Sequence, residues 1–140
     1  MDEHSSVRFA VTADLAEIAA IQAGCEAASQ WAVEDYLRYD CRVAVCGSRV
    51  AGFLVTRQVA EGEREILNIG VAVEFRRRGV ASALVREALR QSPGLCFLEV
   101  RESNHAAQRL YESLGFRPAG IRRNYYSGPD EAAIVMRFFS

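Results

Sequence analysis

The segment from Glu65 to Val100 constrains the fold more than any other part of this 140-residue chain. It opens with a β-rich run, Glu65 to Val73, and then changes to the period of an amphipathic helix. The apolar stripe of that helix comprises Val80, Ala81, Leu84, Val85, Ala88 and Leu89. The helix is followed by Leu95 to Val100, "LCFLEV", a nearly continuous apolar run that is typical of a strand buried on both faces. A strand, a helix and a strand in this order predict a mixed sheet when antiparallel strands surround them.

Antiparallel strands are predicted on both sides of this unit. An alternating run near the N-terminus precedes a helix that Thr12 or Asp14 can cap, and residues 33–39 form a second short helix. Two β-rich runs meet at Gly47, which indicates a hairpin. Beyond "LCFLEV" come a helix that Gly115 ends and two closing strands. The order β-α-α-β-β-β-α-β-α-β-β predicts an α/β (α+β) fold, in which a mixed central sheet of about six to seven strands is flanked by about four helices on both faces.

The composition is that of an ordinary globular chain. We find no repeat, low-complexity segment or linker, and we expect one domain over residues 1–140. The formal net charge of -1 argues against nucleic acid or a membrane surface as a partner. No apolar run approaches the roughly 18 residues of a membrane span, and because the polar opening "MDEHSS" is no secretory signal, we expect the cytoplasm. The cysteines form no CxxC motif and histidines are scarce, so we expect reduced thiols and no metal site.

Three arginines, Arg76 to Arg78, stand directly before Gly79 and the start of the central helix. A helix start has backbone N–H groups without intrahelical partners and a partial positive charge, and glycine lets a ligand approach the backbone closely. This combination suits a phosphate or pyrophosphate. The spacing fits neither a P-loop nor a dinucleotide-binding GxGxxG. The residues alone agree equally well with a glycine turn beside an exposed basic face.

Three further residues have both a structural and a chemical interpretation. Glu99 is the acid within "LCFLEV"; it is a candidate general base if it is desolvated, or a strand-end glutamate that faces solvent or an arginine. Tyr111 lies on the apolar stripe of the last helix, which by itself favours a core tyrosine. Asn104 precedes that helix and can cap it. The residues alone leave these roles open.

Two motifs carry a family resemblance. Arg76-x-x-Gly79-x-Ala81 matches the Q/R-x-x-G-x-G/A loop of the GCN5-related N-acetyltransferases (GNAT), and Asn104 to Phe116, "NHAAQRLYESLGF", matches the helix on the pantetheine side in that family. The chain resembles this family over nearly its whole length, and more closely the RimI-type alanine N-acetyltransferases, which modify a ribosomal-protein N-terminus. "LNIGV", "LEVRESN", "RLYESLGF", "GIRRNYY" and "AAIVM" occur in the order and approximate spacing of that subfamily. The resemblance implies the GNAT fold and acetyl-coenzyme A as the acetyl donor, without a metal.

The resemblance also assigns residues to the donor side and to catalysis. The loop would bind the pyrophosphate through its amides and face it with its arginines, the strand backbone would run along the pantetheine, and Asn104 would contact that arm. The loop comprises Arg76, Arg77, Arg78, Gly79, Val80, Ala81 and Ser82, and the strand positions are Ile69, Gly70 and Val71. Glu99 corresponds to the proposed general base, which acts through water. Tyr111 corresponds to the proposed general acid that protonates the coenzyme A thiolate.

On the acceptor side, the segments around Trp31 and Tyr125-Tyr126 enclose the peptide in the RimI type. Because side chains alternate across a strand, only one of the two tyrosines can face it. "SQWAVEDYL" lacks the usual Pro and Ser beside Trp31, and Val73-Glu74 replaces the usual Asp-Pro. The resemblance implies acetylation of a protein N-terminal α-amine, that of a ribosomal-protein alanine. The same fold also suits acetylation of a small-molecule amine or a lysine side chain, or a coenzyme A-binding module without activity.

Overall fold

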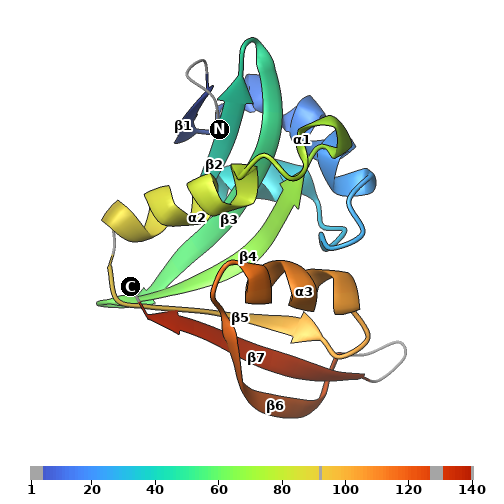
Figure 1. Cartoon of the computed structure of the whole chain (residues 1–140), viewed down its shortest axis with the longest axis vertical. Helices are drawn as coiled ribbons and strands as arrows, with labels where there is room; N and C mark the ends of the chain where they lie inside the picture. The colour runs from blue at the N-terminus through green and yellow to red at the C-terminus, as the bar shows by residue number, and fades with distance from the viewer. Residues whose placement is uncertain (1–4, 92, 127–130, 140) are drawn as a thin grey trace.

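The computed structural model describes residues 5–91, 93–126 and 131–139, of which 124–126 and 139 by their backbone only. Strands and helices follow one another in the order that the residue pattern predicts (Figure 1). The elements in chain order are β1 (Ser5–Phe9), η1 (Thr12–Asp14), α1 (Leu15–Ala23), η2 (Val33–Arg38), β2 (Asp40–Cys46), β3 (Arg49–Ala60), β4 (Glu63–Val71), η3 (Val73–Phe75), α2 (Val80–Gln91), β5 (Leu95–Arg101), α3 (His105–Ser113), β6 (Arg117–Tyr126) and β7 (Glu131–Phe139). The predicted second short helix is η2, a 3-10 helix.

The strands form one seven-stranded sheet in the order β1-β2-β3-β4-β5-β7-β6. The pair β4–β5 is parallel and the other neighbouring pairs are antiparallel, so the predicted mixed sheet is confirmed. The helix α2 connects the two parallel strands, as a crossover between parallel strands requires. A tight turn at Gly47, whose φ is +63°, joins β2 to β3 where the sequence predicts the hairpin.

The parallel pairing of β4 with β5 covers only three residues of each strand. Only Glu63 to Glu65 of β4 pair with Leu95 to Phe97 of β5. Directly beyond, β4 has a bulge: Val55 of β3 faces Asn68, whereas the next residue of β3 faces Ile66. The residue between the two β4 positions is therefore unpaired, which bends the strand. Figure 1 shows β4 and β5 diverging from the end at which they pair.

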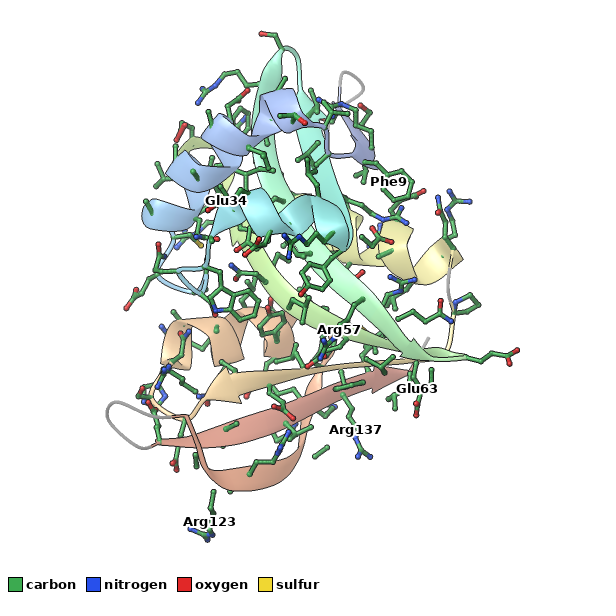
Figure 2. All side chains as sticks on the ribbon, turned by 180° about the vertical axis from the view of Figure 1, so that it is seen from behind. Phe9, Glu34, Arg57, Glu63, Arg123 and Arg137 are labelled. Carbon is green, nitrogen blue, oxygen red and sulfur yellow. The ribbon has the colours of Figure 1, made fainter. Side chains whose placement is uncertain are left out.

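Helices cover the two faces of the sheet and create two cores. Figure 1 shows α2 and α3 on the near face, and Figure 2, from behind, shows α1 and η2 on the other. Successive residues of β3 serve different cores, because side chains alternate across a strand. Phe53 packs with Ile18 of α1 and Tyr36 of η2, whereas Leu54 packs with Leu84 of α2.

The expectation that "LCFLEV" is buried on both faces was wrong. Cys96, Leu98 and Val100 are buried in the core beneath α2 and α3, whereas Phe97 and Glu99 on the opposite face remain partly exposed. The reason is the helix coverage, since α1 packs over β3 and β4 and η2 over β2. A continuous apolar run does not distinguish a strand covered twice from one covered once.

The cysteine thiols are free, as expected. Cys25, Cys41 and Cys96 are buried, and Cys46 is half-buried. Burial raises the pKa of Cys41 to about 12 and that of Cys96 to about 12, so both remain protonated at neutral pH. Among residues 5–91, 93–126 and 131–139, no cluster of His, Cys, Asp and Glu is suited to hold a metal ion. Within the same ranges, no helix combines the length and hydropathy that crossing a bilayer requires.

Asp14 anchors β1 to the start of α1 and gives a prediction about pH-dependent stability. Its buried carboxylate accepts hydrogen bonds from Arg8 Nη1 at 2.7 Å, Arg8 Nη2 at 2.9 Å and the Val11 amide at 2.8 Å. These bonds replace the helix cap expected from the sequence, because the side chain makes no capping bond to α1. The hydrogen bond from Arg8 holds the pKa of Asp14 below its usual range.

We expect Asp14→Asn to lower the free energy of unfolding at pH 7 by about 1–3 kcal/mol, because it removes charge-assisted hydrogen bonds from a buried site. A carboxyl group with a lowered folded-state pKa stabilises the fold above its unfolded pKa of about 3.9, and this stabilisation is lost as pH falls through the folded value. The difference between wild type and variant should therefore shrink below about pH 4. Urea unfolding at pH 7 and pH 3 measures this, and a difference independent of pH would contradict it.

Candidate active site

The loop before α2 has the backbone geometry of an anion site. Arg77 and Gly79 have positive φ angles, +63° and +77°, so the chain turns sharply just before the helix begins at Val80. The first bond of the helix joins the Ala83 amide to the Gly79 carbonyl at 2.9 Å. The amides of residues 80–82 therefore precede the helical ladder and are available to a ligand. Backbone N–H groups in such a turn, together with the helix dipole, favour negative charge.

A cavity of about 480 Å³ opens at this loop. Its walls come from the loop, the segment after α1, the end of β4 with Phe75, and one side of α3. The lining residues are Cys25, Glu26, Ala27, Val71, Phe75, Arg76, Arg77, Gly79, Val80, Ala81, Ser82, Ala106, Leu110, Ser113 and Leu114. Seven of the residues assigned to the donor by the resemblance, Val71, Arg76, Arg77 and Gly79 to Ser82, are thus brought together in one wall.

The three arginines have different surroundings. The Arg76 guanidinium donates to the Val71 carbonyl at 3.3 Å and to the Gly24 carbonyl at 3.1 Å, so it ties the loop to the segment after α1. Arg77 lines the cavity, and the Arg78 guanidinium lies 5.6 Å from the centre of the Phe75 ring. Two arginines in the cavity lining and a third against Phe75, which also lines the cavity, favour a ligand that carries several negative charges.

The remaining donor-side residues lie deeper or beside the cavity. Ile69 and Gly70 are buried in β4, and a Cβ added to Gly70 would stand 2.6 Å from Phe53, so packing alone requires glycine there. Asn104 caps α3, because its side chain accepts the Ala107 amide at 3.0 Å. Its amide nitrogen also lies 3.4 Å from the Ala27 carbonyl, at the cavity wall. The predicted capping role of Asn104 is confirmed.

A second cavity, of about 490 Å³, lies on the face of the sheet that carries η2. Its lining comes from the approach to β2 and from β3, β4 and β5: Trp31, Ala32, Asp35, Tyr36, Tyr39, Val55, Arg57, Glu65, Ile66, Leu67 and Glu99. Trp31 is 48% exposed, at the rim. Arg57 donates to Glu65 at 2.8 Å across β3 and β4, and Figure 2 shows it near the divergence of β4 and β5. This cavity therefore combines an aromatic rim with charged groups.

Glu99 lies at the wall of the second cavity and beside an arginine. It lines the second cavity, and its side chain is only 12% exposed. Its Oε1 also accepts a hydrogen bond from Arg122 Nη1 at 2.7 Å, from the neighbouring β6–β7 hairpin. An ion pair at the cavity wall keeps a carboxylate oriented.

The two groups of tyrosines are placed differently. Tyr111 is buried in the core, with its ring edge-on to Phe116 at a centroid distance of 5.7 Å. It lies on α3, which walls the first cavity, but it is not among the lining residues of either cavity. Tyr125 and Tyr126 end β6, and their side chains lie outside the described part of the structure.

Sequence reasoning missed a buried polar cluster, one member of which, Tyr36, lines the second cavity. It consists of Gln22 from α1, Tyr36 from η2 and Asn68 from β4. The available signal was polarity within apolar patterns: Gln22 occupies the apolar stripe of its helix, and Asn68 interrupts a β-rich run. Arg122 was also missed, because only the folded sheet brings it to Glu99.

Comparison with known proteins identifies a common family. The sequence profile of the Acetyltransferase (GNAT) family matches residues 13–116. The [ribosomal protein bS18]-alanine N-acetyltransferase of Escherichia coli strain K12 is 43% identical over 94 residues. The matched segment spans 63% of this chain and 63% of that relative, less than two thirds of its length.

Solved structures extend the similarity to nearly the whole chain. The crystal structure of the ribosomal-protein-S18-alanine N-acetyltransferase from Escherichia coli has a TM-score of 0.75 and 31% identity, and the match covers 96% of this chain and 93% of that one. Arabidopsis thaliana NAA60, solved in complex with acetyl-CoA, has a TM-score of 0.77 with 97% and 99% covered. Its identity is 20%, so it shares the fold alone.

Proposed function

Because the chain belongs to the acetyltransferase (GNAT) family, we propose that it is an enzyme that transfers the acetyl group of acetyl-coenzyme A to the α-amine of a protein N-terminus. The acceptor that we propose is the N-terminal alanine of a small-subunit ribosomal protein, because the Escherichia coli relative has that named activity. The observation that carries the proposal is a pair of cavities that share β4: Val71 lines the cavity at the arginine–glycine loop, and Leu67 lines the cavity that contains Glu99.

The donor would occupy the first cavity. Coenzyme A carries several phosphate charges, and the loop offers the unpaired amides of residues 80–82 together with Arg77. Asn104 and the backbone of residues 69–71 would then support the pantetheine arm. This assignment needs no metal, since the helix start and the arginines supply the positive field.

The acceptor would occupy the second cavity, where Trp31 stands at the rim and Glu99 inside. The amine nitrogen attacks the thioester carbonyl carbon; the N–C bond forms and the C–S bond breaks. Glu99, through water, would take the proton that the amine must lose. Tyr111 lies on α3, which walls the donor cavity, and its hydroxyl would protonate the departing thiolate while its ring stays in the core. An α-amine has a pKa of about 8, against about 10.4 for lysine, so a larger fraction of it is already neutral near pH 7 and a modest base suffices.

A comparison of two peptides tests the acceptor. Both begin with the alanine sequence of ribosomal protein bS18 and contain a lysine, but one has its α-amine blocked. We expect mass spectrometry to show one acetyl group on the free peptide alone, placed by fragmentation on the N-terminal nitrogen.

Acetylation of the blocked peptide would contradict the proposal and indicate a lysine acceptor. If neither peptide reacts while polyamines or amino acids do, the acceptor is a small amine. Coenzyme A binding without transfer to any of these amines would indicate a module without this activity.

A further inference from the structure

The segment between α1 and η2, residues 24–32, is held against β4 by the buried polar cluster of Gln22, Tyr36 and Asn68. Their exposed fractions are 5%, 1% and 2%. The Tyr36 hydroxyl donates to Gln22 Oε1 in a short hydrogen bond, and the Tyr36 ring stacks on Phe53 at 5.9 Å. A buried polar side chain without partners would cost free energy, so such a cluster is stable only in an arrangement that satisfies its members.

Asn68 is the centre of this cluster. Its Nδ2 donates to the Ser29 carbonyl at 2.8 Å and lies 2.9 Å from the Tyr36 hydroxyl and 3.1 Å from Gln22 Oε1. Its Oδ1 accepts the Ser29 amide at 2.9 Å and the Ile69 amide at 3.0 Å. The Asn68 side chain thus bonds both the amide and the carbonyl of Ser29, which lies in the middle of the segment. Asn68 itself belongs to the bulged part of β4.

The two ends of the segment belong to different cavities. Cys25, Glu26 and Ala27 line the cavity at the arginine–glycine loop, whereas Trp31 and Ala32 line the cavity that contains Glu99. The acceptor end has a contact of its own, since Gln22 Nε2 donates to the Trp31 carbonyl at 2.7 Å. The donor end is tied by Arg76 to the Gly24 carbonyl. Ser29 lies between the two ends, so if the segment loses its order at Ser29, the lining of both cavities is disturbed.

We propose that Asn68 is a positioning residue that keeps the segment 24–32 ordered before either ligand binds. The donor and the acceptor would then each bind to a cavity whose wall is already formed. The proposal rests on the assignment of the two cavities to coenzyme A and to a peptide. Without the Asn68 contacts, each ligand would have to order the segment as it binds, and its affinity would fall by that cost. Once one ligand has ordered the segment, the second would no longer bear the cost.

Asn68→Asp tests this, because the residue keeps its size while both amide donors are lost. Calorimetric titrations would measure Kd for coenzyme A, for the acceptor peptide, and for the peptide when coenzyme A is saturating. We expect both single-ligand Kd values to rise about ten-fold, which corresponds to the loss of a well-formed buried hydrogen bond. With coenzyme A saturating, the peptide Kd should return to within about three-fold of the wild-type value, and by linkage the converse should hold.

Two further variants serve as comparisons. Thr56→Val removes a buried hydrogen bond elsewhere in the sheet, the one that the Thr56 hydroxyl accepts from Arg64 at 2.8 Å, and Thr56 lines neither cavity. The variant should lose stability while each Kd changes less than about three-fold. Gln22→Leu removes the contact to the Trp31 carbonyl. It should therefore raise the Kd for the peptide about ten-fold and the Kd for coenzyme A less than about three-fold. If the charge that Asn68→Asp places in a buried site prevents folding, Asn68→Ala removes the same contacts to Ser29 without adding a charge, and the same three titrations decide the test.

The possible outcomes separate the claims. Unchanged Kd values with only a smaller fraction of active protein would mean that Asn68 serves stability alone, and the proposal fails. Weaker binding without recovery in the presence of coenzyme A would also overturn it. If the wild-type protein does not bind the peptide, the proposed acceptor is wrong, and the coenzyme A titrations alone decide whether Asn68 positions the donor wall.

Discussion

Glu99→Gln is expected to lower kcat by about 100-fold or more, because glutamine has the size of glutamate but cannot take the proton from the amine. The Kd for coenzyme A should stay within about two-fold of the wild-type value, since Glu99 lines the other cavity. Steady-state kinetics with the free peptide, together with calorimetric titration of coenzyme A, measure both quantities. The difference in kcat between Glu99→Gln and wild type should become smaller above about pH 8, where the α-amine loses its proton to solvent.

Arg122→Gln is the matched control for this variant. It removes the 2.7 Å contact to Glu99 Oε1 but leaves the carboxylate in the cavity. Its effect on kcat should be smaller, about ten-fold at most, because the base is retained and only its orientation is loosened. Wild-type turnover by Glu99→Gln would remove Glu99 from the mechanism, and an equal loss in both variants would assign the effect to the ion pair.

Gly79→Ala is expected to weaken coenzyme A binding by about 30-fold. At φ +77°, an L-residue with a Cβ costs about 1–2 kcal/mol, and relief of this strain turns the loop amides away from the ligand. Because the effect arises at the phosphate site, pantetheine, which lacks the phosphates of coenzyme A, should bind to the variant and to wild type with the same affinity. Calorimetric titrations of coenzyme A and pantetheine measure the difference.

Gly47→Ala provides the control for backbone strain. Gly47 has a similar φ of +63° in the β2–β3 turn, and an added Cβ would meet nothing within 4 Å. Both variants should lose similar thermal stability, whereas only Gly79→Ala should lose affinity. Equal affinity of Gly79→Ala and wild type for coenzyme A would exclude the loop as the pyrophosphate site.

The local elements of this fold were predictable because each has a local cause. The stripe of α2 has the helical period, and the hairpin at Gly47 and the helix end at Gly115 both use positive φ angles that glycine adopts without strain. The loop motif was predictable for the same reason, since its glycine and the helix start are neighbours in sequence. Seven of the residues that the resemblance assigns to the donor accordingly line one cavity.

The acceptor side was less accessible to sequence reasoning. Glu99 could be named, but its partner Arg122 lies on a strand that reaches it only through β7 in the strand order β5-β7-β6. Asn68, Gln22 and Tyr36 come from three elements, and each alone resembles a misplaced polar residue in an apolar pattern. Their structural role depends on the hydrogen bonds that they make with one another, and these bonds form only after the helices pack.

By itself, the sequence determined the order of strands and helices, the mixed sheet and the arginine–glycine loop, because periodicity and backbone preference act over a few neighbouring residues. Only the tertiary structure decided that β4 and β5 part after a short pairing, that β5 is covered on one face, and that one buried asparagine supports a segment with an end in each cavity. Those features arise from contacts between distant residues, and burial and hydrogen-bond partners do not exist until the chain has folded.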